Sequence, residues 1–283
     1  MTVVSEEILS PGEDTRHAWS KLAPGYDKAV TPTHLWLGNE SVRHVGLRSG
    51  MRFLDVAAGS GALSIPAARL GAQVLATDQS AVMLERLEER ARKEGLAIET
   101  RVMDGHALAL ADDCFDIVGS QFGVMLFPDM PKGIREMARV VKPGGHVLIT
   151  AYGNSCKIEF FHFFVDAIKS VRPGFNGPSK DPPPLPFQLQ DPVRLQNELA
   201  SAGLKDSKVE TITETMEFGS GADLWDWLVS SNPIVDVVLD GLNLTNPERE
   251  VIRQSLDRMV RERAGRSSAA TLTSPINIGV GTK

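Results

Sequence analysis

Three acidic residues lie at or just after the ends of three short apolar runs in the first half of the chain. Asp55 lies in the first run and is followed by Gly59 and Gly61, Asp78 ends the second run, and Asp104 follows the third. Glycines after a strand let a ligand approach the backbone, and free amides at the start of the next helix favour negative or polar groups. Three neighbouring carboxylates suit a neutral nucleoside with a cationic or zwitterionic tail. They suit a pyrophosphate poorly, because like charges repel.

Two of these carboxylates fit particular parts of a nucleoside. Asp78 can accept hydrogen bonds from both hydroxyls of a ribose, and Asp104 can accept one from an exocyclic amine such as that of adenine. The glycines after Asp55 do not complete a NAD fingerprint, because Ser64 stands where that fingerprint needs a third glycine or an alanine. A P-loop is absent as well.

The elements that must position these residues alternate in type. Short apolar runs predict five strands, at residues 51–56, 73–78, 98–103, 115–120 and 146–151. Amphipathic patterns between them predict three helices, at residues 62–70, 80–93 and 130–141. Two further strands are predicted at residues 208–218 and 270–281. Strands that alternate with helices indicate an α/β fold with a doubly wound, mostly parallel sheet of seven strands, which binds its ligand beyond the carboxyl ends of the strands.

Composition narrows the class of protein. The chain has 283 residues with a formal net charge of −6, so no bulk positive field attracts nucleic acid or anionic lipid. Two cysteines cannot form a disulfide scaffold or a four-thiolate metal site. The first residues lack the features of a signal peptide, and no apolar run is long enough to cross a bilayer. We therefore expect a cytoplasmic protein with no membrane span, no nucleic-acid partner and no metal.

Five segments in sequence order carry a resemblance to a known family. They are FLDVAAGSG (53–61), VLATDQSAVML (74–84), VMDGHALAL (102–110), FDIVGSQFGVMLFPD (115–129) and REMARVVKPGGHVLI (135–149). Together they resemble the class I S-adenosylmethionine-dependent methyltransferases of the UbiE-like small-molecule type. The segment WSKLAPGYD (19–27) is similar to the leading helix of that family. The resemblance implies a Rossmann-like methyltransferase fold and S-adenosylmethionine as the cofactor.

The resemblance also implies a role for each matching residue. It places Asp55, Gly59 and Gly61 at the methionine end, Asp78 on the ribose, Gln79 and Met83 beside the adenosine, Asp104 with Gly105 at the adenine amine, Gln121 in the lining of the site, and Tyr26 at its border. One position departs from the family pattern, because Ala57 replaces its first glycine. A methyl group there is compatible with binding, and indicates that close backbone approach is not needed at that point.

The chain then divides into three zones of one methyltransferase domain. Residues 1–48 are predicted to form a helical cap, residues 49–153 the cofactor-binding core, and residues 154–283 lid insertions and the last strands. Seven prolines fall between Pro173 and Pro192, a density that excludes a helix interior and predicts a rigid extended loop. Such insertions after the fifth strand would lie above the methyl donor.

The acceptor is expected to be a small, apolar or aromatic molecule. The stretch 158–164 sets four phenylalanines around His162, which is typical either of a substrate wall with a base or of core packing around a satisfied histidine. His162 is therefore the candidate catalytic base. His17, His34 and His106 have no motif context that demands a proton acceptor, and the pair Trp225 and Trp227 fits a lid helix or plain packing equally well.

The chemistry follows from the cofactor that the resemblance implies. A nucleophile on the acceptor attacks a sulfonium methyl in line, so alignment in a dry site supplies much of the rate, and neither a covalent enzyme intermediate nor a metal is required. Two alternatives stay open at this point. The chain could methylate RNA or protein, or it could bind S-adenosylmethionine without catalysis. The oligomeric state is not predicted.

Overall fold

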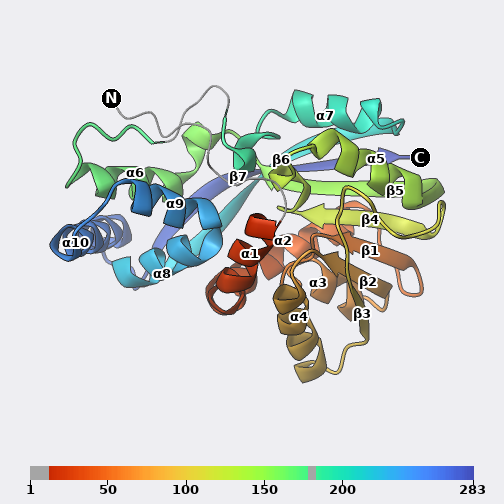
Figure 1. Ribbon diagram of the computed structural model, residues 1–283, viewed down its shortest axis with the longest axis horizontal. Coiled ribbons are helices and arrows are strands. Elements are labelled where there is room, and N and C mark those ends of the chain that lie inside the picture. The colour runs from red at the N-terminus through yellow and green to blue at the C-terminus, as the bar shows by residue number, and fades with distance from the viewer. Residues whose placement is uncertain (1–12, 178–182) are drawn as a thin grey trace.

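A computed structural model describes residues 13–177 and 183–283 and shows seven strands in one sheet (Figure 1). The strands are β1 (Arg52–Val56), β2 (Gln73–Asp78), β3 (Ile98–Val102), β4 (Phe115–Gln121), β5 (Val141–Tyr152), β6 (Lys205–Phe218) and β7 (Ala270–Thr282). Their order across the sheet is β3-β2-β1-β4-β5-β7-β6. β1 to β5 pair in parallel, and β7 is antiparallel to both of its neighbours. The predicted seven-stranded, mostly parallel sheet is confirmed.

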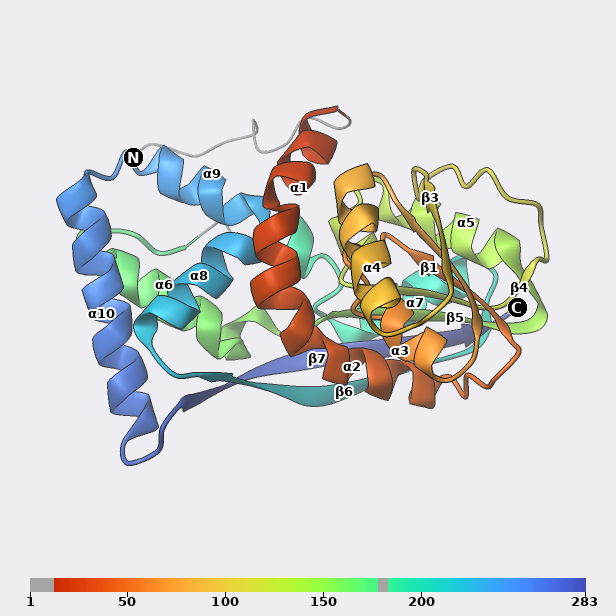
Figure 2. The same cartoon turned by 90° about the horizontal axis from the view of Figure 1, so that it is seen from below.

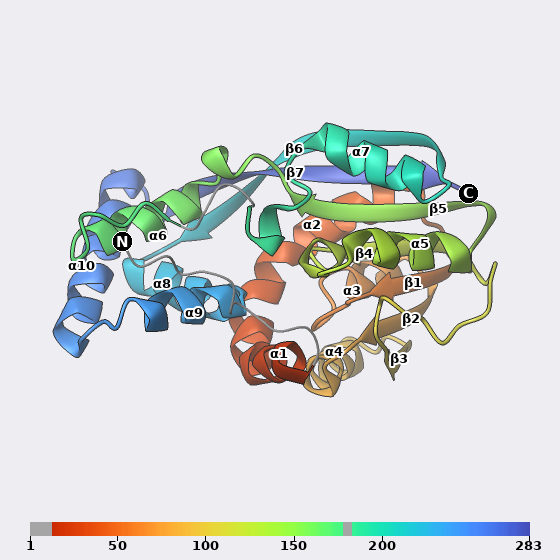
Figure 3. The same cartoon turned by 45° about the horizontal axis from the view of Figure 1, so that its top comes forward.

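Helices cover both faces of the sheet and form a second cluster at one end (Figures 1 and 3). The α-helices are α1 (Glu13–Gly25), α2 (Thr31–His44), α3 (Ser64–Arg69), α4 (Ala81–Lys93), α5 (Met130–Val140), α6 (Glu159–Lys169), α7 (Pro192–Ser201), α8 (Gly221–Ser231), α9 (Pro233–Gly241) and α10 (Asn246–Ala264). A π-helical turn, Tyr26–Val30, joins α1 to α2. The predicted N-terminal helices are therefore present within the described residues.

Local sequence explains where these helices begin. The Ser80 hydroxyl accepts a hydrogen bond from the Met83 amide and so caps α4, one residue before its first helical residue. Thr245 and Glu248 form a reciprocal capping box at the start of α10. Pro66 lies in the first turn of α3, where it removes no internal hydrogen bond of the helix. Serine, threonine and proline are typical of these positions at the start of a helix.

Two hydrophobic clusters are joined by the two longest strands of the sheet. The first cluster lies between the sheet and the helices that flank it. The second is formed by α6, α8, α9, α10 and one end of β6 and β7. Figure 2 shows β6 and β7 running from the sheet to this helical cluster. The zone 154–283 therefore both completes the sheet and builds a separate apolar body beside it.

Strand β5 begins earlier than predicted. The segment 142–145, which separates the predicted helix 130–141 from the predicted strand 146–151, belongs to the strand that starts at Val141. The amide of Gly144 donates to the carbonyl of Lys283 at 2.9 Å, and the Lys283 amide donates to the carbonyl of Gly145 at 3.0 Å. Backbone pairing with the C-terminal residue therefore overrides the turn propensity of the two glycines.

The proline-rich segment is only partly as predicted. Part of the predicted extended loop, residues 178–182, lies outside the described residues. Beyond them, Leu185–Phe187 forms one turn of 3₁₀ helix with Pro186 buried. A proline in the first turn of such a helix gives up no internal hydrogen bond, which is why proline density does not exclude it. None of the helices in the described part of the chain is both long and apolar enough to span a bilayer.

Candidate cofactor and acceptor site

A cavity of about 310 Å³ opens where β1, β2 and β4 end. We call it the strand-end cavity. Ten of the eleven residues that the sequence assigned to cofactor contacts line it, namely Tyr26, Asp55, Ala57, Gly59, Asp78, Gln79, Met83, Asp104, Gly105 and Gln121. Parallel strands bring these side chains together because their carboxyl ends lie on the same edge of the sheet. Convergence of the three carboxylates on one cavity is the arrangement that the sequence predicts.

Gly61 is the exception, and its place at the methionine end stays a prediction. It is absent from the residues that line the strand-end cavity. A Cβ at this position would lie 2.9 Å from Cγ of Leu87, and the backbone has φ +99°. Close packing of the loop against α4 and a left-handed backbone thus both favour a glycine at position 61.

The loop after β1 is shaped by residues with left-handed backbone angles. Ala57 has φ +56° and Gly59 has φ +54°. This left-handed angle explains why the family pattern has a glycine where this chain has Ala57, because glycine adopts such angles without strain. The amide of Gly59 donates to Oδ2 of Asp78 at 2.9 Å, which ties this loop to the end of β2.

Asp55 is buried with one oxygen unsatisfied. Oδ2 accepts a hydrogen bond from the Ser64 hydroxyl at 2.5 Å, whereas Oδ1 is buried and has no partner. Burial raises the pKa of Asp55 to about 7. Oε1 of Gln121 is a second buried acceptor without a partner in the same cavity. Two unsatisfied acceptors fit a cationic donor such as the ammonium group of S-adenosylmethionine, because buried polar groups are normally hydrogen-bonded.

Asp78 keeps acceptor capacity for a ligand although backbone amides already hold it. Its Oδ1 accepts from the Ser80 amide at 2.9 Å, and its Oδ2 accepts from the Gly59 amide. Burial raises the pKa of this carboxyl group. An ionised carboxylate offers about four lone-pair positions, so two further hydrogen bonds from ribose hydroxyls fit.

Asp104 stands at the exposed rim of the cavity. Its Oδ1 accepts hydrogen bonds from the His106 amide at 2.8 Å and from His106 Nδ1 at 2.7 Å. Partial burial raises the pKa of Asp104, but these bonds outweigh it and lower the pKa below its usual value. The His106 ring lies 4.5 Å from the ring of Phe127, centroid to centroid. These two rings form a rim beside which a flat base can lie.

The ion pair between Asp27, the residue after Tyr26, and Arg90 holds Tyr26 over the loop after β1. Asp27 accepts from Arg90 of α4 at 2.5 Å through its carboxylate and at 2.8 Å through its carbonyl. Cε1 of Tyr26 lies 3.9 Å from the Cβ position of Gly59, and the Trp19 ring packs on Tyr26 edge to face. Burial raises the pKa of Tyr26, so the phenol stays neutral near pH 7.

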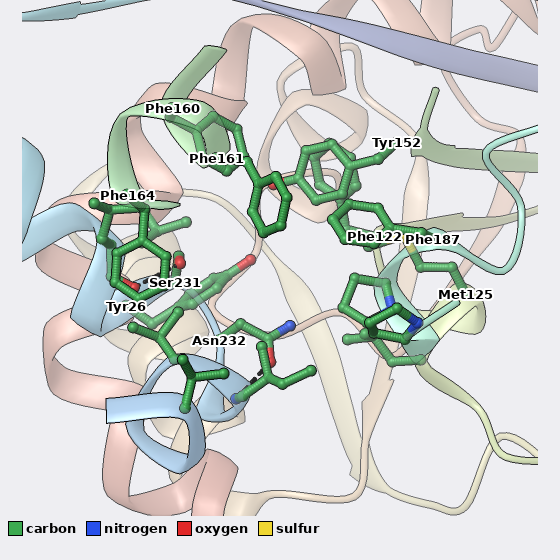
Figure 4. Close-up of a pocket in the computed structure, with 18 of the residues that line it drawn as sticks. Tyr26, Phe122, Met125, Tyr152, Phe160, Phe161, Phe164, Phe187, Ser231 and Asn232 are labelled. Atoms are coloured by element: carbon green, nitrogen blue, oxygen red, sulfur yellow. Dashed lines mark hydrogen bonds between the residues drawn. The ribbon is translucent and has the colours of Figure 1, made fainter. Parts of the chain in front are cut away.

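A second cavity, of about 100 Å³, adjoins the first. We call it the aromatic cavity. Its wall includes aromatic rings from several elements, among them those of Tyr26, Phe122, Tyr152, Phe160, Phe161 and Phe187. Figure 4 shows these rings together with Ser231 and Asn232 around the opening. The two cavities share Trp19, Tyr26, Phe122 and Leu126. They therefore meet at Tyr26 and Phe122.

His162 does not reach either of these cavities. Its side chain is exposed, and Nε2 lies 2.9 Å from the carbonyl oxygen of Cys156. Phe160 and Phe164 of the same helix face the aromatic cavity, and a residue midway between them on an α-helix points to the opposite side. The expectation that His162 acts as a base on the acceptor is therefore not supported by its position.

Sequence reasoning missed a histidine that does line the aromatic cavity. His34 of α2 is buried, and its Nδ1 lies 3.0 Å from Oε1 of Glu214 on β6. A weak signal for Glu214 was present, because it occupies an inward position of an alternating strand between Ile212 and Met216. No local signal exists for His34, because its partner stands far along the chain. No group of potential metal ligands is found among the described residues.

Comparisons with known proteins agree with this geometry. Residues 54–149 match the family model described as a methyltransferase domain. An uncharacterized protein of Mycobacterium tuberculosis is 39% identical over 148 residues, which cover 52% of each chain. The chain thus matches about half the length of such relatives. A demethylmenaquinone methyltransferase of Renibacterium salmoninarum is 32% identical over 179 residues, covering 61% of this chain and 73% of the relative. The UbiE C-methyltransferase of Bdellovibrio bacteriovorus is 36% identical over 149 residues, covering 50% and 63%.

Solved structures share the fold at low sequence identity. The YcgJ protein of Bacillus subtilis has a TM-score of 0.55 and 16% identity, covering 88% of this chain and 97% of that one. Phosphoethanolamine N-methyltransferase 2 of Haemonchus contortus, in complex with S-adenosylmethionine, has a TM-score of 0.51 and 20% identity, covering 87% and 52%. With a relative of which nearly three quarters is matched, and with this fold and cavity, the chain belongs to the class I S-adenosylmethionine-dependent methyltransferases.

Proposed function

We propose that the protein methylates a small aromatic acceptor, in the manner of UbiE-like small-molecule methyltransferases. The observation that carries this proposal is the aromatic cavity, which adjoins the strand-end cavity and shares Tyr26 and Phe122 with it. The relatives support a small acceptor, because one is named for ubiquinone and menaquinone biosynthesis and another for demethylmenaquinone. The first of these alignments covers 50% of this chain.

The strand-end cavity supplies a partner for each part of the cofactor. Unsatisfied acceptors on Asp55 and Gln121 would take the ammonium group, Asp78 the ribose hydroxyls, and Asp104 the adenine amine. When bound, S-adenosylmethionine supplies an electrophilic methyl carbon on a positively charged sulfur. Tyr26 and Phe122 present aromatic faces where the cavities meet, and such faces stabilise a nearby cation.

The aromatic cavity would bind the acceptor mainly by excluding water. Burial of apolar area contributes about 25 cal/mol per Å², so several rings around one acceptor supply most of its binding free energy. Asn232 adds a polar contact, since its Oδ1 accepts from the Ile234 amide at 3.0 Å while its amide nitrogen points into the cavity (Figure 4). Orientation in such a dry site brings the acceptor into line for attack.

The cofactor half of the proposal is tested with Asp78→Ala. We expect the affinity for S-adenosylmethionine to fall by about 1–3 kcal/mol, because ribose hydroxyls lose a buried acceptor. Isothermal titration calorimetry measures this change, with the exposed acid Asp166→Ala on α6 as the matched control. An unchanged affinity in Asp78→Ala would contradict the ribose assignment.

The acceptor half is tested by transfer of an isotopically labelled methyl group. We expect label to reach small phenols and quinols, and not transfer RNA or a mixture of denatured proteins, because the cavity wall is aromatic and enclosed by α6, α8 and α9. Transfer to RNA or protein alone would overturn the small-molecule proposal. Saturable cofactor binding without transfer to any of these acceptors would do the same.

A further inference from the structure

Two ionisable side chains from distant parts of the chain meet in the interior. His34 of α2 is 1% exposed and Glu214 of β6 is 0% exposed, and Nδ1 of the histidine lies 3.0 Å from Oε1 of the glutamate. The other carboxylate oxygen of Glu214 is buried without a partner. Removing a carboxylate from water costs free energy that one hydrogen bond only partly offsets. Such a pair stabilises a core poorly. A functional role is therefore sought in the cavity beside it.

The free edge of the imidazole faces the aromatic cavity. An ionised carboxylate can only accept hydrogen bonds, so the proton of a neutral His34 lies on Nδ1 and points to Glu214. Nε2 then carries a lone pair. His34 lines the aromatic cavity, and Nε2 takes part in none of the hydrogen bonds found among the described residues. The pair thus presents one basic nitrogen to whatever occupies the cavity.

Three contacts fix this nitrogen close to where the two cavities meet. The His34 ring lies 4.8 Å from the ring of Phe122, which lines both cavities. The side-chain amide of Gln121 donates to the His34 carbonyl at 3.1 Å. At the start of α2, the Thr31 hydroxyl lies 2.5 Å from that of Ser60 in the loop after β1. The helix that carries His34 is therefore tied to the loop and strand that build the strand-end cavity.

We propose that His34 is the general base of the reaction and that its substrate is an aromatic acceptor with an ionisable hydroxyl group. The inference rests on the proposed function and adds the chemical class of the acceptor. In the step, the O–H bond of the acceptor breaks, its electron pair stays on the oxygen, and the proton moves to Nε2. The acceptor becomes a phenolate nucleophile and His34 becomes an imidazolium. Glu214 is a positioning residue, which holds the tautomer and balances the new charge.

The need for such a base follows from the acidities involved. A phenol ionises near pH 10 and an imidazole near pH 6.5, so a neutral phenol gains reactivity at pH 7 only where a base accepts its proton. The other titratable side chains that line the aromatic cavity are Tyr26 and Tyr152. Burial raises the pKa of both, and the nearby charge of Glu214 raises both further. They remain neutral phenols and do not act as bases near pH 7.

The test uses two probes that differ by the proton in question. The full-length protein is saturated with S-adenosylhomocysteine, which prevents turnover, and is titrated with 2-naphthol and with 2-methoxynaphthalene. We expect 2-naphthol to bind about tenfold more tightly, because its hydroxyl donates to Nε2 and the ether cannot. We also expect part of the bound 2-naphthol to show the absorption of the naphtholate at a pH where free 2-naphthol is neutral, because the carboxylate of Glu214 stabilises the imidazolium that forms beside it.

Two substitutions at His34 separate proton transfer from packing. His34→Asn keeps an amide donor toward Glu214 and removes the atom at Nε2. His34→Gln places an amide at that point, which can hydrogen-bond but cannot take a proton. Both should abolish the naphtholate absorption, and His34→Asn should also reduce the preference for 2-naphthol to about twofold or less. Glu214→Gln should weaken the naphtholate absorption at each pH, a change that a purely structural role would not produce.

The chain offers a matched control in the same two elements. His44 of α2 and Glu210 of β6 form a pair with Nε2 and Oε2 2.7 Å apart, with side chains 33% and 61% exposed. His44→Asn and Glu210→Gln should leave the binding and the absorption of 2-naphthol unchanged. Unchanged affinity for S-adenosylhomocysteine shows that each variant is folded.

The outcomes separate this inference from the function on which it rests. Equal binding of the two probes to the wild-type protein, or naphtholate absorption that survives in both His34 variants, overturns the role of His34 and leaves an aromatic acceptor site in place. If neither probe binds, the aromatic acceptor and the base are both overturned. Tighter binding of 2-naphthol, with an absorption change that only the His34 and Glu214 variants reduce, establishes the proposal.

Discussion

The strand-end cavity and the aromatic cavity are neighbours, yet they are built in different ways. Apart from three residues of the N-terminal segment, the strand-end cavity is lined by residues between positions 55 and 128. The aromatic cavity collects residues from α1 to α9, between positions 19 and 238. A parallel sheet fixes the first, because the ends of neighbouring strands must converge. The second depends on how separate helices pack, so the chain can vary it without disturbing the first.

The largest expected effect is on the aromatic side. Phe160 is buried and its ring lies 4.8 Å from that of Trp227 and 5.9 Å from that of Tyr152. Phe160→Ala should lower the free energy of unfolding by about 3–5 kcal/mol, through lost apolar burial and the cavity left behind. Affinity for S-adenosylmethionine should stay within about twofold of the wild type. Denaturant unfolding and calorimetry measure the two quantities.

Phe163→Ala is the matched control for Phe160→Ala. Phe163 belongs to the same helix and packs against the same hydrophobic cluster, but it does not line the aromatic cavity. Its loss should destabilise the protein less and leave acceptor binding intact. A large fall in cofactor affinity in Phe160→Ala alone would contradict the view that the aromatic cavity can change without disturbing the strand-end cavity.

The second-largest expected effect concerns Asp55 of the strand-end cavity and is a change of the free energy of unfolding with pH. Burial raises the pKa of Asp55 from 3.8 to about 7. Between these values the folded protein keeps a proton that the unfolded chain has released, so the free energy of unfolding falls as the pH rises from about 4 to about 7. Asp55→Asn removes this fall. The variant should gain about 3 kcal/mol relative to the wild type between pH 5 and pH 8.

The free energies of unfolding of the variant and the wild type are subtracted at each pH, so the contributions of other titrating groups cancel. One such group is Asp78, whose pKa burial also raises and which is present in both proteins. The same substitution should weaken cofactor binding, because the ammonium group loses its charge partner. A gain in stability together with a loss of affinity would mark Asp55 as a residue kept for binding. A stability difference that does not change with pH would show that Asp55 is ionised in the folded protein throughout.

The strand-end cavity could be predicted because its signals are local. Burial on both faces makes β1, β2 and β4 short apolar runs, and the polar residues at their ends are then the ones that reach a ligand. Asp55, Asp78 and Gln121 were assigned to the site in this way, and all three line the strand-end cavity. Gly61 has a packing reason for being glycine that the sequence did not reveal, because a glycine needed for packing and one needed for ligand approach look the same in a sequence.

The aromatic cavity could be predicted in composition but not in detail. The phenylalanine-rich segment 158–164 indicated an apolar acceptor site, yet it did not tell which face of α6 turns inward. His162 was therefore preferred over His34, whose partner Glu214 is 180 residues away in the chain. Only tertiary packing brings α2 and β6 together, and no pattern within either segment reports on the other.

The smallest expected effect concerns the backbone of Ala57, which lines the strand-end cavity. Ala57 holds a backbone angle of φ +56°, which costs a residue with a Cβ about 1 kcal/mol or more. Ala57→Gly relieves this strain, while the greater freedom of glycine in the unfolded chain offsets part of the gain. We expect the free energy of unfolding to rise by about 0.5–1 kcal/mol with cofactor affinity unchanged.

Gly46→Ala is the reverse control, because Gly46 has φ +68° and open space around its Cβ position. This substitution should destabilise the protein by a similar amount. If Ala57→Gly instead lowers cofactor affinity, the alanine methyl itself contacts the ligand, and position 57 belongs to recognition rather than to backbone shape.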